Sequence, residues 1–517
     1  MTSSVTQRYG IVLSDNGSAV GLPLEALVRP ALRRNPRRAQ LLVSTVLGKH
    51  IPVDPRVVAG VGRLLGALVA NWLADDGSAL PDGWAAAAAA ALAGEDPSAL
   101  LHRMDQQPVR PDSTVLTIGF AETATALGHL VADQLGSGYL HSTRRRSGDV
   151  PVAAEFSEPH SHATGHLLRP ASPDLLAAAG TVVLVDDELS TGRTALNVVE
   201  VLHAIRPRQR YVLAGLVDVR SAAADAHRAD TAERLGCRID VVALVRGSVH
   251  VAADAAGRVA AELGAADPGA VADPRVAADP DVAGSGVARS GVADPVAPRV
   301  VSAEHVSSGT DAASTGTDAA STGADAASTW TEPRLPPGGA VDRSSFTSVT
   351  SVRWPAGVPV GGAHGYLPSD RAPFDAAVLT VADQLASAVG DAHRVLVLGT
   401  EEFLYLPLRV ALILADNGER MVAFQSTTRS PVHAIDESGY PIRRRIDFRS
   451  FVDGGPHTEP RFLYNAGWPS GSPAEPDVVV IIDDGSQVPS PAGAAAAVAA
   501  VTGAPVLLFD IAPESGR

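Results

Sequence analysis

Two adjacent carboxylates followed by a hydroxyl-rich loop are the residues best suited to chemistry in this sequence. The apolar run 182–185 ends in Asp186 and Asp187, and Glu188 follows directly. The loop after them, which precedes a helical pattern, consists of Ser190, Thr191, Gly192, Arg193 and Thr194. N–H groups and hydroxyls at a helix start suit a phosphate, and glycine permits close backbone approach. Since paired carboxylates can accept hydrogen bonds from sugar hydroxyls, this segment predicts a site for a phosphorylated sugar.

Alternating strands and helices must position this segment. Short runs rich in Val, Ile and Leu lie at 115–120, 181–187, 211–219 and 238–245. Helical patterns separate them at 121–135, 193–205 and 221–235. This alternation predicts a parallel, doubly wound α/β sheet, which binds ligands at the carboxyl ends of its strands. Helices are also expected upstream, at 56–73 and 85–101. A second α/β unit is predicted from strand-like runs at 394–399, 422–427, 477–482 and 505–510.

Residues 264–340 differ in composition from the rest of the chain. Asp-Pro recurs at a six-residue step, and a heptad of the type GTDAAST repeats over 309–329. The only aromatic residue is Trp330, so the segment cannot bury enough apolar surface to fold, and its heptads lack the large apolar residues of a coiled coil. A disordered linker with a reach of about 50 Å is predicted. The expected parts of the chain are therefore 1–110, completing or packing on the first domain, its core 111–263, the linker 264–340 and a second domain 341–517.

Charge and composition exclude several classes of partner. The 42 basic residues stand against 57 acidic ones, a net charge of −15, which argues against a general binder of nucleic acid or anionic membranes. The single cysteine, Cys237, excludes a disulfide framework and a Cys-rich zinc site. No signal peptide is expected, because the stretch MTSSVTQRYG has no basic stretch followed by an apolar run. No membrane span is expected either, because Gly503 and Pro505 interrupt the longest apolar run, 492–509. A cytoplasmic protein with neither a membrane nor a nucleic-acid partner is expected.

The segment 182–194 resembles the phosphoribosyl pyrophosphate (PRPP) signature of type I phosphoribosyltransferases. That signature has four hydrophobic residues, two acidic residues and a short Thr/Gly phosphate loop, and a chance strand–turn–helix is the structural alternative. The resemblance implies a hooded, parallel α/β fold that displaces pyrophosphate from ribose C1. Asp186 and Asp187 would hold the ribose hydroxyls, residues 190–194 would bind the 5-phosphate, and Glu188 is the nearest candidate for a general base. Mg²⁺ would be held through PRPP oxygens and water rather than by a protein cage.

The same family implies a pyrophosphate loop after the first core strand and basic residues that cover it. The matching loop, which lacks the usual tandem glycine, contains Gly119, Phe120, Ala121, Glu122 and Thr123. Arg144 and Arg145 are expected to clamp pyrophosphate, although a solvated arginine run is the alternative. His160 and His162 are candidate acid–base or metal groups in the next segment. Purine-salvage relatives carry Asp where this chain has Ser190, so the pattern is nearer to the orotate type and the acceptor stays open.

Further segments narrow the resemblance. The stretch Asn35-Pro36-Arg37-Arg38 and residues 42–44 and 47–52 precede the core, while GTEEF (399–403) and TRSP (428–431) follow the linker. This combination resembles two-domain bacterial proteins in which an orotate-type phosphoribosyltransferase domain precedes a TRSP domain, associated with tellurite-resistance-type stress gene clusters. It implies a pentosyltransferase that makes a nucleoside-like or ribosylated metabolite from PRPP and an unidentified acceptor. The alternative is a non-catalytic PRPP or nucleotide sensor in a stress response.

A few residues outside the signature are further candidate ligands. Lys49 is the only lysine of the chain and lies in one of the family segments, which makes it a candidate for a phosphate or the acceptor. The second domain offers Glu402, Thr428, Arg429 and Ser430, where an arginine beside hydroxyls suits a carboxylate or phosphate; a structural strand end is the alternative. Relatives of the fold are often dimers, so a homodimer is expected, although no feature of the sequence fixes it.

The two units also resemble each other. Similar residues occur in the same order and at roughly the same spacing in 115–145 and in 395–430, and Asp186-Asp187 matches Asp483-Asp484. We hypothesise that the second unit is a diverged copy of the phosphoribosyltransferase fold in which Gln487-Val488-Pro489 replaces the phosphate loop. The hypothesis requires Gly119 and Gly399 to lie on equivalent strands. The alternative is that unrelated α/β sheets share such strand ends.

Overall fold

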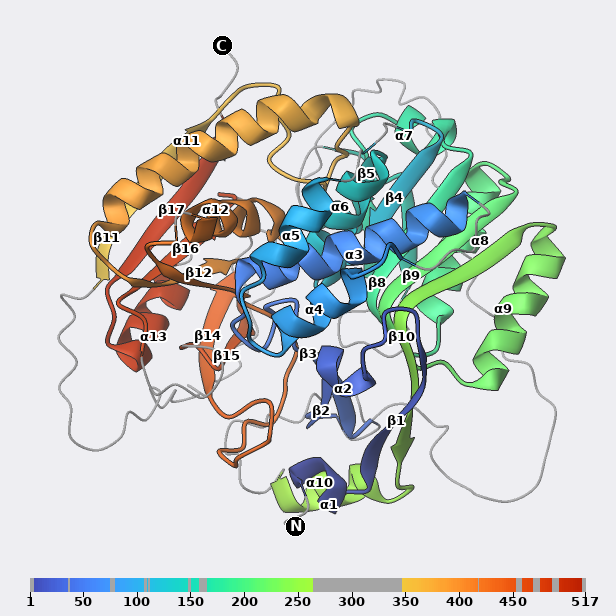
Figure 1. Ribbon diagram of the computed structural model, residues 1–517, viewed down its shortest axis with the longest axis horizontal. Helices are drawn as coiled ribbons and strands as arrows, with labels where there is room; N and C mark the ends of the chain where they lie inside the picture. The colour runs from blue at the N-terminus through green and yellow to red at the C-terminus, as the bar shows by residue number, and fades with distance from the viewer. Residues whose placement is uncertain are drawn as a thin grey trace, which may run out of the picture.

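The structure is a computed structural model that describes residues 4–35, 38–74, 80–106, 109, 112–146, 150–157, 165–263, 346–416, 418–451, 458–467, 475–485 and 492–513. Two α/β units lie side by side (Figure 1). We call the described residues up to 263 the N-unit and those from 346 onward the C-unit. The predicted linker lies outside the described residues, and so do His160, His162 and the segment 486–491.

The N-unit is built on a six-stranded sheet in the order β1-β10-β9-β8-β4-β5. Its strands are β1 (Ile11–Ser18), β4 (Val115–Gly119), β5 (Gly138–His141), β8 (Thr181–Leu189), β9 (Arg210–Asp218) and β10 (Arg238–Val251). Neighbouring strands from β10 to β5 are parallel, which confirms the predicted doubly wound sheet. The edge strand β1 pairs antiparallel with β10 and was not predicted, because after Ile11 its residues are mostly exposed and polar.

Helices cover both faces of this sheet. The main ones are α3 (Pro55–Leu73), α6 (Ala124–Leu135), α8 (Arg193–Ile205) and α9 (Ala222–Leu235). By length and composition α3 could cross a membrane, but 67% of its apolar window is buried inside the structure. It packs closely on α6, since a Cβ added at Gly62 would lie 2.5 Å from Leu130 Cδ1. The single helix predicted at 85–101 is wrong: α4 (Trp84–Leu92) and α5 (Ser98–Asp105) are separated by Gly94, at φ +93°, and by Pro97.

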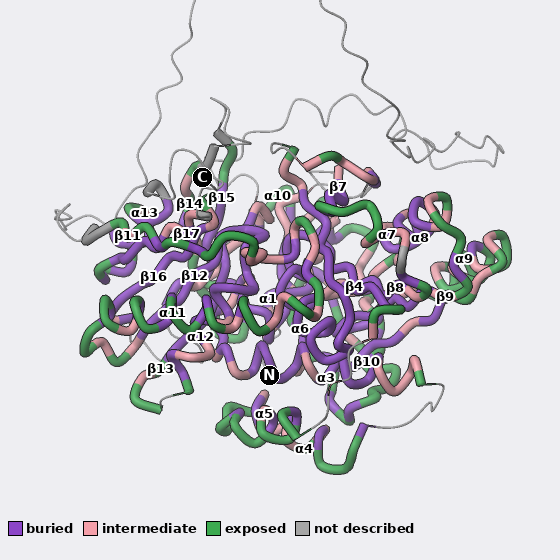
Figure 2. Tube along the Cα trace, turned by 90° about the horizontal axis from the view of Figure 1, so that it is seen from above, coloured by how far each residue is buried: buried purple, intermediate pink, exposed green. Residues whose placement is uncertain are grey.

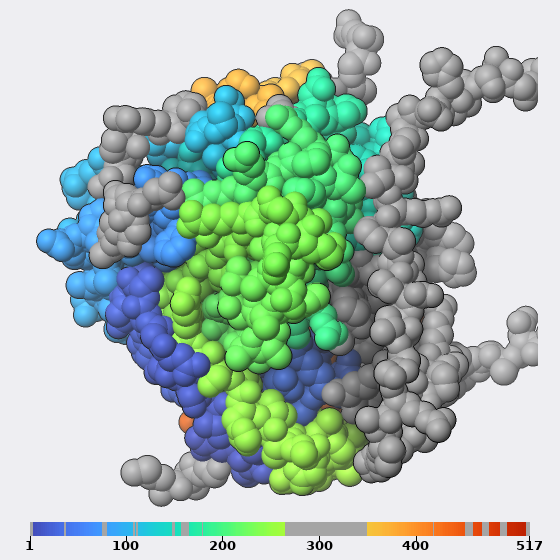
Figure 3. Space-filling model, turned by 90° about the vertical axis from the view of Figure 1, so that its right-hand side faces the viewer, coloured from blue at the N-terminus to red at the C-terminus, as the bar shows by residue number. Residues whose placement is uncertain are grey.

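Smaller elements complete the N-unit. Two antiparallel hairpins are β2 (Val28–Leu32) with β3 (Gln40–Ser44), and β6 (Ala154–Ser157) with β7 (Gly165–Leu168). The short helices are α1 (Val5–Arg8), α2 (Leu24–Leu27), α7 (Asp174–Ala178) and α10 (Ala255–Leu263). Figure 3 shows the N-terminal segment running over the face formed by β10 and α10. From Tyr9 to Ser18, this segment is thus held against β10 and α10.

The C-unit carries a five-stranded, wholly parallel sheet in the order β11-β17-β16-β12-β13. Its strands are β11 (Phe346–Trp354), β12 (Arg394–Gly399), β13 (Met421–Ser426), β16 (Val478–Asp483) and β17 (Val506–Pro513). The other elements are the 3₁₀ helix η3 (Pro368–Asp370), α11 (Arg371–Val389), α12 (Tyr405–Asp416), α13 (Ala492–Thr502) and the hairpin of β14 (Arg445–Phe451) and β15 (Thr458–Tyr464). The predicted second α/β unit is confirmed.

The strand registers place Gly119 and Gly399 on equivalent strands. In the N-unit β4 lies between β8 and β5, and in the C-unit β12 lies between β16 and β13. Gly119 is opposite Val185, the residue before Asp186, just as Gly399 is opposite Ile482, the residue before Asp483. The condition set by the duplication hypothesis is met. One difference is that the place of β10 is taken by β11, which comes first in its unit.

The two units share one hydrophobic core. Its buried residues include Leu130 and Tyr139 of the N-unit and Phe374 and Tyr405 of the C-unit. Both central sheets are buried in Figure 2, with exposed residues concentrated in the outer helices and turns. The packing therefore holds the ends of β4 and β8 at a fixed position beside the C-unit, which is where the expected site residues lie.

Candidate active site

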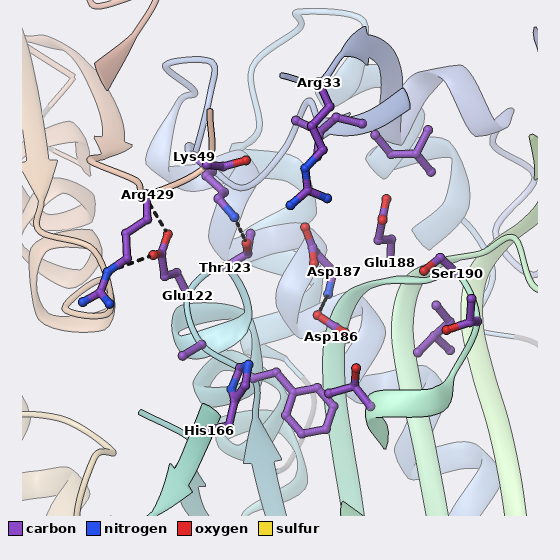
Figure 4. Close-up of a pocket in the computed structure, with 18 of the residues that line it drawn as sticks. Arg33, Lys49, Glu122, Thr123, His166, Asp186, Asp187, Glu188, Ser190 and Arg429 are labelled. Atoms are coloured by element: carbon purple, nitrogen blue, oxygen red, sulfur yellow. Dashed lines mark hydrogen bonds and ion pairs between the residues drawn. The ribbon is translucent and has the colours of Figure 1, made fainter. Parts of the chain in front are cut away.

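A pocket of about 190 Å³ lies at the carboxyl ends of β4 and β8, beneath the β2–β3 hairpin and against the C-unit (Figure 4). From the acidic segment and the loop it contains Asp186, Asp187, Glu188, Ser190, Thr191, Gly192 and Thr194. From the expected pyrophosphate loop it contains Phe120, Ala121, Glu122 and Thr123. The other expected residues that line it are Lys49, Arg144, Arg429 and Ser430. The structure thus brings together most candidates, from segments up to hundreds of residues apart.

The remaining candidates lie elsewhere. Gly119 ends β4 beneath the pocket, where a Cβ would lie 2.4 Å from the carbonyl oxygen of Ala124, so its role is close packing. Arg193, the first residue of α8, is exposed. Arg145 does not line the pocket, because its Nη1 lies 2.7 Å from Asp484 Oδ2 in the C-unit. The last two, Glu402 and Thr428, hold the two units together, as described below.

The turn from β8 into α8 forms one end of the pocket. Gly192 has a φ of +70° at the N-cap of α8, a conformation that glycine adopts without strain. Thr194 and Ala195, in the first turn of the helix, line the pocket. The first N–H groups of a helix have no partner within it and attract anions. Together with the hydroxyls of Ser190 and Thr191, this end of the pocket suits a phosphate group.

The acidic residues occupy the middle of the pocket in Figure 4. The N–H group of Asp187 donates to Asp186 Oδ1 at 2.9 Å. Glu188 Oε1 accepts from Arg38 Nη2 at 3.3 Å, while Oε2 is buried without a hydrogen bond to any described residue. Burial raises the pKa of Glu188 to about 7; Arg38 opposes the shift and Asp187 adds to it. This carboxyl group can therefore take up or release a proton near neutral pH.

The other end of the pocket is the loop after β4. Lys49 Nζ donates to Thr123 Oγ1 at 2.6 Å, so the only lysine of the chain lies beside the expected pyrophosphate loop (Figure 4). The C-unit reaches the same loop, because Thr428 Oγ1 donates to Glu122 Oε2 at 2.9 Å. Arg429 Nε lies 3.5 Å from Glu122 Oε1. With Arg144, which also lines the pocket, cationic groups from three parts of the chain thus lie at this end.

The lining residues that were not predicted as ligands are Arg33, Arg38, Leu41, Leu42, His50, His166, Leu189, Ala195 and Pro431. Arg38, Leu42, His50 and Pro431 lie within segments that carried the family resemblance, which was the available signal. Arg33, Leu41 and His166 had none. His166 Nδ1 lies 3.0 Å from Ser142 Oγ, which accepts the N–H of Ala121, so this histidine supports the loop after β4. Burial, Lys49 and Arg33 lower the pKa of His50 well below its usual value.

The donor set of the pocket fits a Mg²⁺ ion carried with a phosphorylated ligand. No group of three or more His, Cys, Asp or Glu within the described part of the chain is arranged to hold a metal ion by itself. Asp186 and Asp187 nevertheless present carboxylates to the pocket. Mg²⁺ prefers oxygen ligands and keeps several waters. A magnesium ion that takes its other ligands from phosphate oxygens and water is compatible with these residues.

Two family models match the chain. Residues 27–248 match a family described as phosphoribosyl transferase, and residues 360–498 match the TRSP domain, described as C-terminal to that transferase domain. The first match contains the N-unit residues of the pocket, and the second contains Arg429 and Ser430. No protein of curated function matches the chain.

Solved structures with similarity to the chain include three phosphoribosyltransferases. The adenine phosphoribosyltransferase of Rhodothermus marinus has 14% identity and a TM-score of 0.24, over 44% of this chain and 98% of that chain. That of Trypanosoma brucei, in complex with AMP, pyrophosphate and ribose-5-phosphate, has 18% identity and a TM-score of 0.22, over 30% and 68%. A hypoxanthine phosphoribosyltransferase of Staphylococcus aureus has 10% identity and a TM-score of 0.19, over 34% and 70%.

Proposed function

The chain belongs to the family in which a phosphoribosyl transferase domain is followed by a TRSP domain, and on that basis we propose that it transfers a phosphoribosyl group from PRPP to a small acceptor with release of pyrophosphate. One observation supports this most strongly: the order of groups across the pocket. Figure 4 shows Ser190 at one end, Asp186 and Asp187 in the middle, and Thr123 with Lys49 at the other end. PRPP carries its 5-phosphate, its two ring hydroxyls and its pyrophosphate in the same order.

In this proposal the protein contributes positioning and charge. The first turn of α8 and the loop 190–194 hold the 5-phosphate, and the carboxylates of Asp186 and Asp187 accept hydrogen bonds from the ribose hydroxyls. Lys49, Arg144 and Arg429 line the end where negative charge develops as pyrophosphate leaves. Fixed cationic groups in a partly closed site stabilise such charge better than water does, because they need no reorganisation. When bound with PRPP, Mg²⁺ would neutralise further charge on the departing pyrophosphate.

Glu188 is proposed as the residue that exchanges a proton with the acceptor. It lies beside the acidic pair and under the β2–β3 hairpin, which supplies Arg38, Leu41 and Leu42. A carboxyl group whose pKa is raised to about 7 is ionised often enough at neutral pH to act as a base. The acceptor would therefore bind between Glu188 and the hairpin, with its attacking atom over ribose C1.

The wider setting is proposed from the family resemblance. The reaction would serve the biosynthesis of a nucleoside-like or ribosylated metabolite, in a cytoplasmic response to stress of the kind that tellurite provokes. The acceptor itself is left as a small molecule that a pocket of about 190 Å³ can admit beside the sugar.

Pyrophosphate release tests the proposal. The full chain is incubated with PRPP, Mg²⁺ and fractionated cell extract as the source of acceptor, and pyrophosphate is measured with a coupled assay. We expect release that depends on one fraction and falls by about tenfold or more in Asp187→Asn, because a charge-assisted hydrogen bond to ribose is lost. A chain that binds PRPP but never releases pyrophosphate with any fraction would contradict the enzyme and favour a PRPP sensor.

A further inference from the structure

The two units hold each other through a reciprocal pair of buried glutamates. Glu122 follows β4 of the N-unit and accepts from Thr428 Oγ1 at 2.9 Å and from the N–H of Arg429 at 3.4 Å. Its counterpart Glu402 follows β12 of the C-unit. It accepts from Thr143 Oγ1 at 2.6 Å and from the N–H of Arg144 at 2.8 Å. Each unit thus gives a glutamate to the Thr-Arg pair of the other.

A second reciprocal contact joins the sheet edges. Residues 48–53, which we call the N-strap, run along β13, where Val53 and Phe424 exchange hydrogen bonds of 3.0 and 2.8 Å. Residues 362–366, the C-strap, run along β5, where Tyr139 and Tyr366 exchange hydrogen bonds of 2.7 and 2.8 Å. Each strap leads to a helix of 19 residues, α3 or α11. The strand registers make Tyr139 and Phe424 equivalent positions.

Such reciprocity is the mark of a two-fold symmetric dimer, in which residue i of one subunit contacts residue j of the other and the reverse contact is also made. Here both halves of the contact lie within one chain. The two-fold relation makes the pocket at Asp186 and Asp187, which we call the open pocket, equivalent to a site in the C-unit at Asp483 and Asp484, which we call the mirror site. The Arg-Ser pair that the C-unit places in the open pocket corresponds to Arg144-Arg145 of the N-unit. Of these two, Arg144 lines the open pocket, whereas Arg145 reaches Asp484 of the mirror site.

Two substitutions distinguish the mirror site from the open pocket. Glu401 of the C-unit occupies the position equivalent to Ala121. The N–H of Ala121 donates to Ser142 Oγ at 3.0 Å, and the N–H of Glu401 donates to the equivalent Thr427 Oγ1 at 3.1 Å. Arg145 of the N-unit occupies the position equivalent to Ser430. The N–H of Arg145 donates to Thr143 Oγ1 at 3.0 Å, and the N–H of Ser430 donates to the equivalent Thr428 Oγ1 at 3.1 Å. The open pocket therefore has two small residues where the mirror site has two long charged ones.

Those charged residues fill the mirror site with internal ion pairs. Arg145 Nη1 lies 2.7 Å from Asp484 Oδ2. Glu401 is 2% exposed and accepts from Arg461 Nε on one oxygen and from Arg429 Nε, at 2.6 Å, on the other. Burial acts to raise the pKa of Glu401, but Arg429, Arg461 and Arg145 outweigh it and lower the pKa to about 2. The same ion pair fixes the guanidinium of Arg429 at the wall of the open pocket.

We propose that the C-unit is a built-in second subunit, which completes the open pocket with Arg429 and Ser430 while its own mirror site is closed by Glu401 and by the Arg145–Asp484 ion pair. Each chain then binds one PRPP, and the TRSP tetrapeptide is part of the binding site of the N-unit. The inference rests on the proposed function only for the identity of the ligand. Glu401 acts as a positioning residue, since it holds Arg429 without lining the pocket.

Titration calorimetry with PRPP and Mg²⁺ on the full chain tests this inference. We expect one PRPP per chain, and equivalent substitutions in the two sites should differ in effect. Asp187→Asn should weaken binding by about tenfold or more, whereas Asp484→Asn should leave the affinity within about twofold. Ser430→Arg introduces the side chain that closes the mirror site, so it should abolish measurable binding. Arg429→Ala should weaken binding by about tenfold, with Arg443→Ala, an exposed arginine of the C-unit, as the control.

The outcomes separate the two proposals. Thermal melts confirm first that each variant is folded. A wild-type chain that takes up no PRPP would overturn the proposed function together with this inference. Binding of one PRPP that neither Ser430→Arg nor Arg429→Ala weakens would overturn the inference alone. Two PRPP molecules per chain, or an equal loss in Asp484→Asn and Asp187→Asn, would likewise show that the mirror site is not closed.

Discussion

Glu188 combines burial, the nearby cations of Arg38 and Arg33 and a place at the pocket wall, and these determine its pH behaviour. Its pKa is raised to about 7 by burial. A base works in its ionised form, so turnover should rise as the pH increases through about 7 and level off above it. Glu188→Gln should remove this rise and slow turnover by about 10²- to 10⁴-fold. The measurement is a pH–rate profile of pyrophosphate release for both proteins.

A matched variant separates this effect from a general loss of charge. Glu155 pairs with Arg146 at the surface of the N-unit and lies outside the pocket. Glu155→Gln should keep the rise near neutral pH. If Glu188→Gln keeps it as well, another group carries the proton.

Lys49 is the residue whose chemical type matters most for the pyrophosphate end. Its ammonium donates to Thr123 Oγ1 at 2.6 Å from the N-strap, in a chain that otherwise uses arginine. An ammonium is a compact point charge, whereas a guanidinium is planar and larger, so Lys49→Arg should misplace the charge and weaken PRPP binding by about tenfold. The reciprocal change Arg29→Lys, at an exposed position of β2, serves as the control in the same calorimetric measurement. Unchanged affinity and turnover in Lys49→Arg would leave the single lysine without a role.

At the scale of elements, the turn from β8 into α8 must adopt a conformation that only glycine adopts easily. Gly192 has a φ of +70°, and a Cβ there would lie 3.3 Å from Arg220 Cδ. Gly192→Ala should lower the free energy of unfolding by about 1 kcal/mol and also weaken binding of PRPP, because the N–H groups of the turn move. Gly21→Ala provides the comparison, since Gly21 has a φ of +69° with nothing within 4 Å of an added Cβ.

These two variants should lose similar stability in chemical denaturation, and only Gly192→Ala should lose affinity. If both variants bind PRPP as tightly as the wild-type chain, the loop 190–194 does not contact the ligand. If both variants lose the same affinity relative to the wild-type chain, the cause is a general destabilisation rather than the turn.

The elements that the sequence predicted well are those whose signals are local. The strand, acidic pair, loop and helix from 181 to 205 are consecutive, so their pattern and their place at the sheet edge could be inferred together. The prediction of one helix at 85–101 failed because the alanine-rich pattern concealed the break at Gly94 and Pro97. The edge strand β1 gave little signal, since an edge strand that faces solvent does not need an apolar run.

The part of the site that could not be predicted depends on contacts between distant segments. Arg38 meets Glu188 across 150 residues of sequence, and Thr428 meets Glu122 across 306. Nothing in the local pattern of either segment shows which partner it will find. The family segments indicated that Lys49 and Arg429 matter, but only the packing of the straps and of β4 against the C-unit shows that both lie at one end of one pocket.

For the whole molecule, the internal two-fold relation changes the expected assembly. Relatives of the fold led us to expect a homodimer, yet the N-strap already pairs with the edge strand β13 and the C-strap with β5. Since the chain supplies both halves of its own dimer-like contact, we expect a monomer of 53.0 kDa that is active without self-association. Light scattering at several concentrations measures the mass. Specific activity that rises with concentration in step with a doubled mass would contradict a self-sufficient chain.

The same relation predicts that the covalent connection between the units is dispensable once the chain has folded. The contacts that join them are backbone pairs of both straps, the buried Glu122 and Glu402, and a common hydrophobic core. A protease site placed within residues 264–345 allows the folded chain to be cut once. We expect the two fragments to elute together in size-exclusion chromatography and to bind one PRPP with an affinity within about twofold of the uncut chain. The uncut variant with the same insertion is the control. Fragments that separate, with binding lost, would show that the chain connection rather than the interface places Arg429 and Ser430 at the pocket.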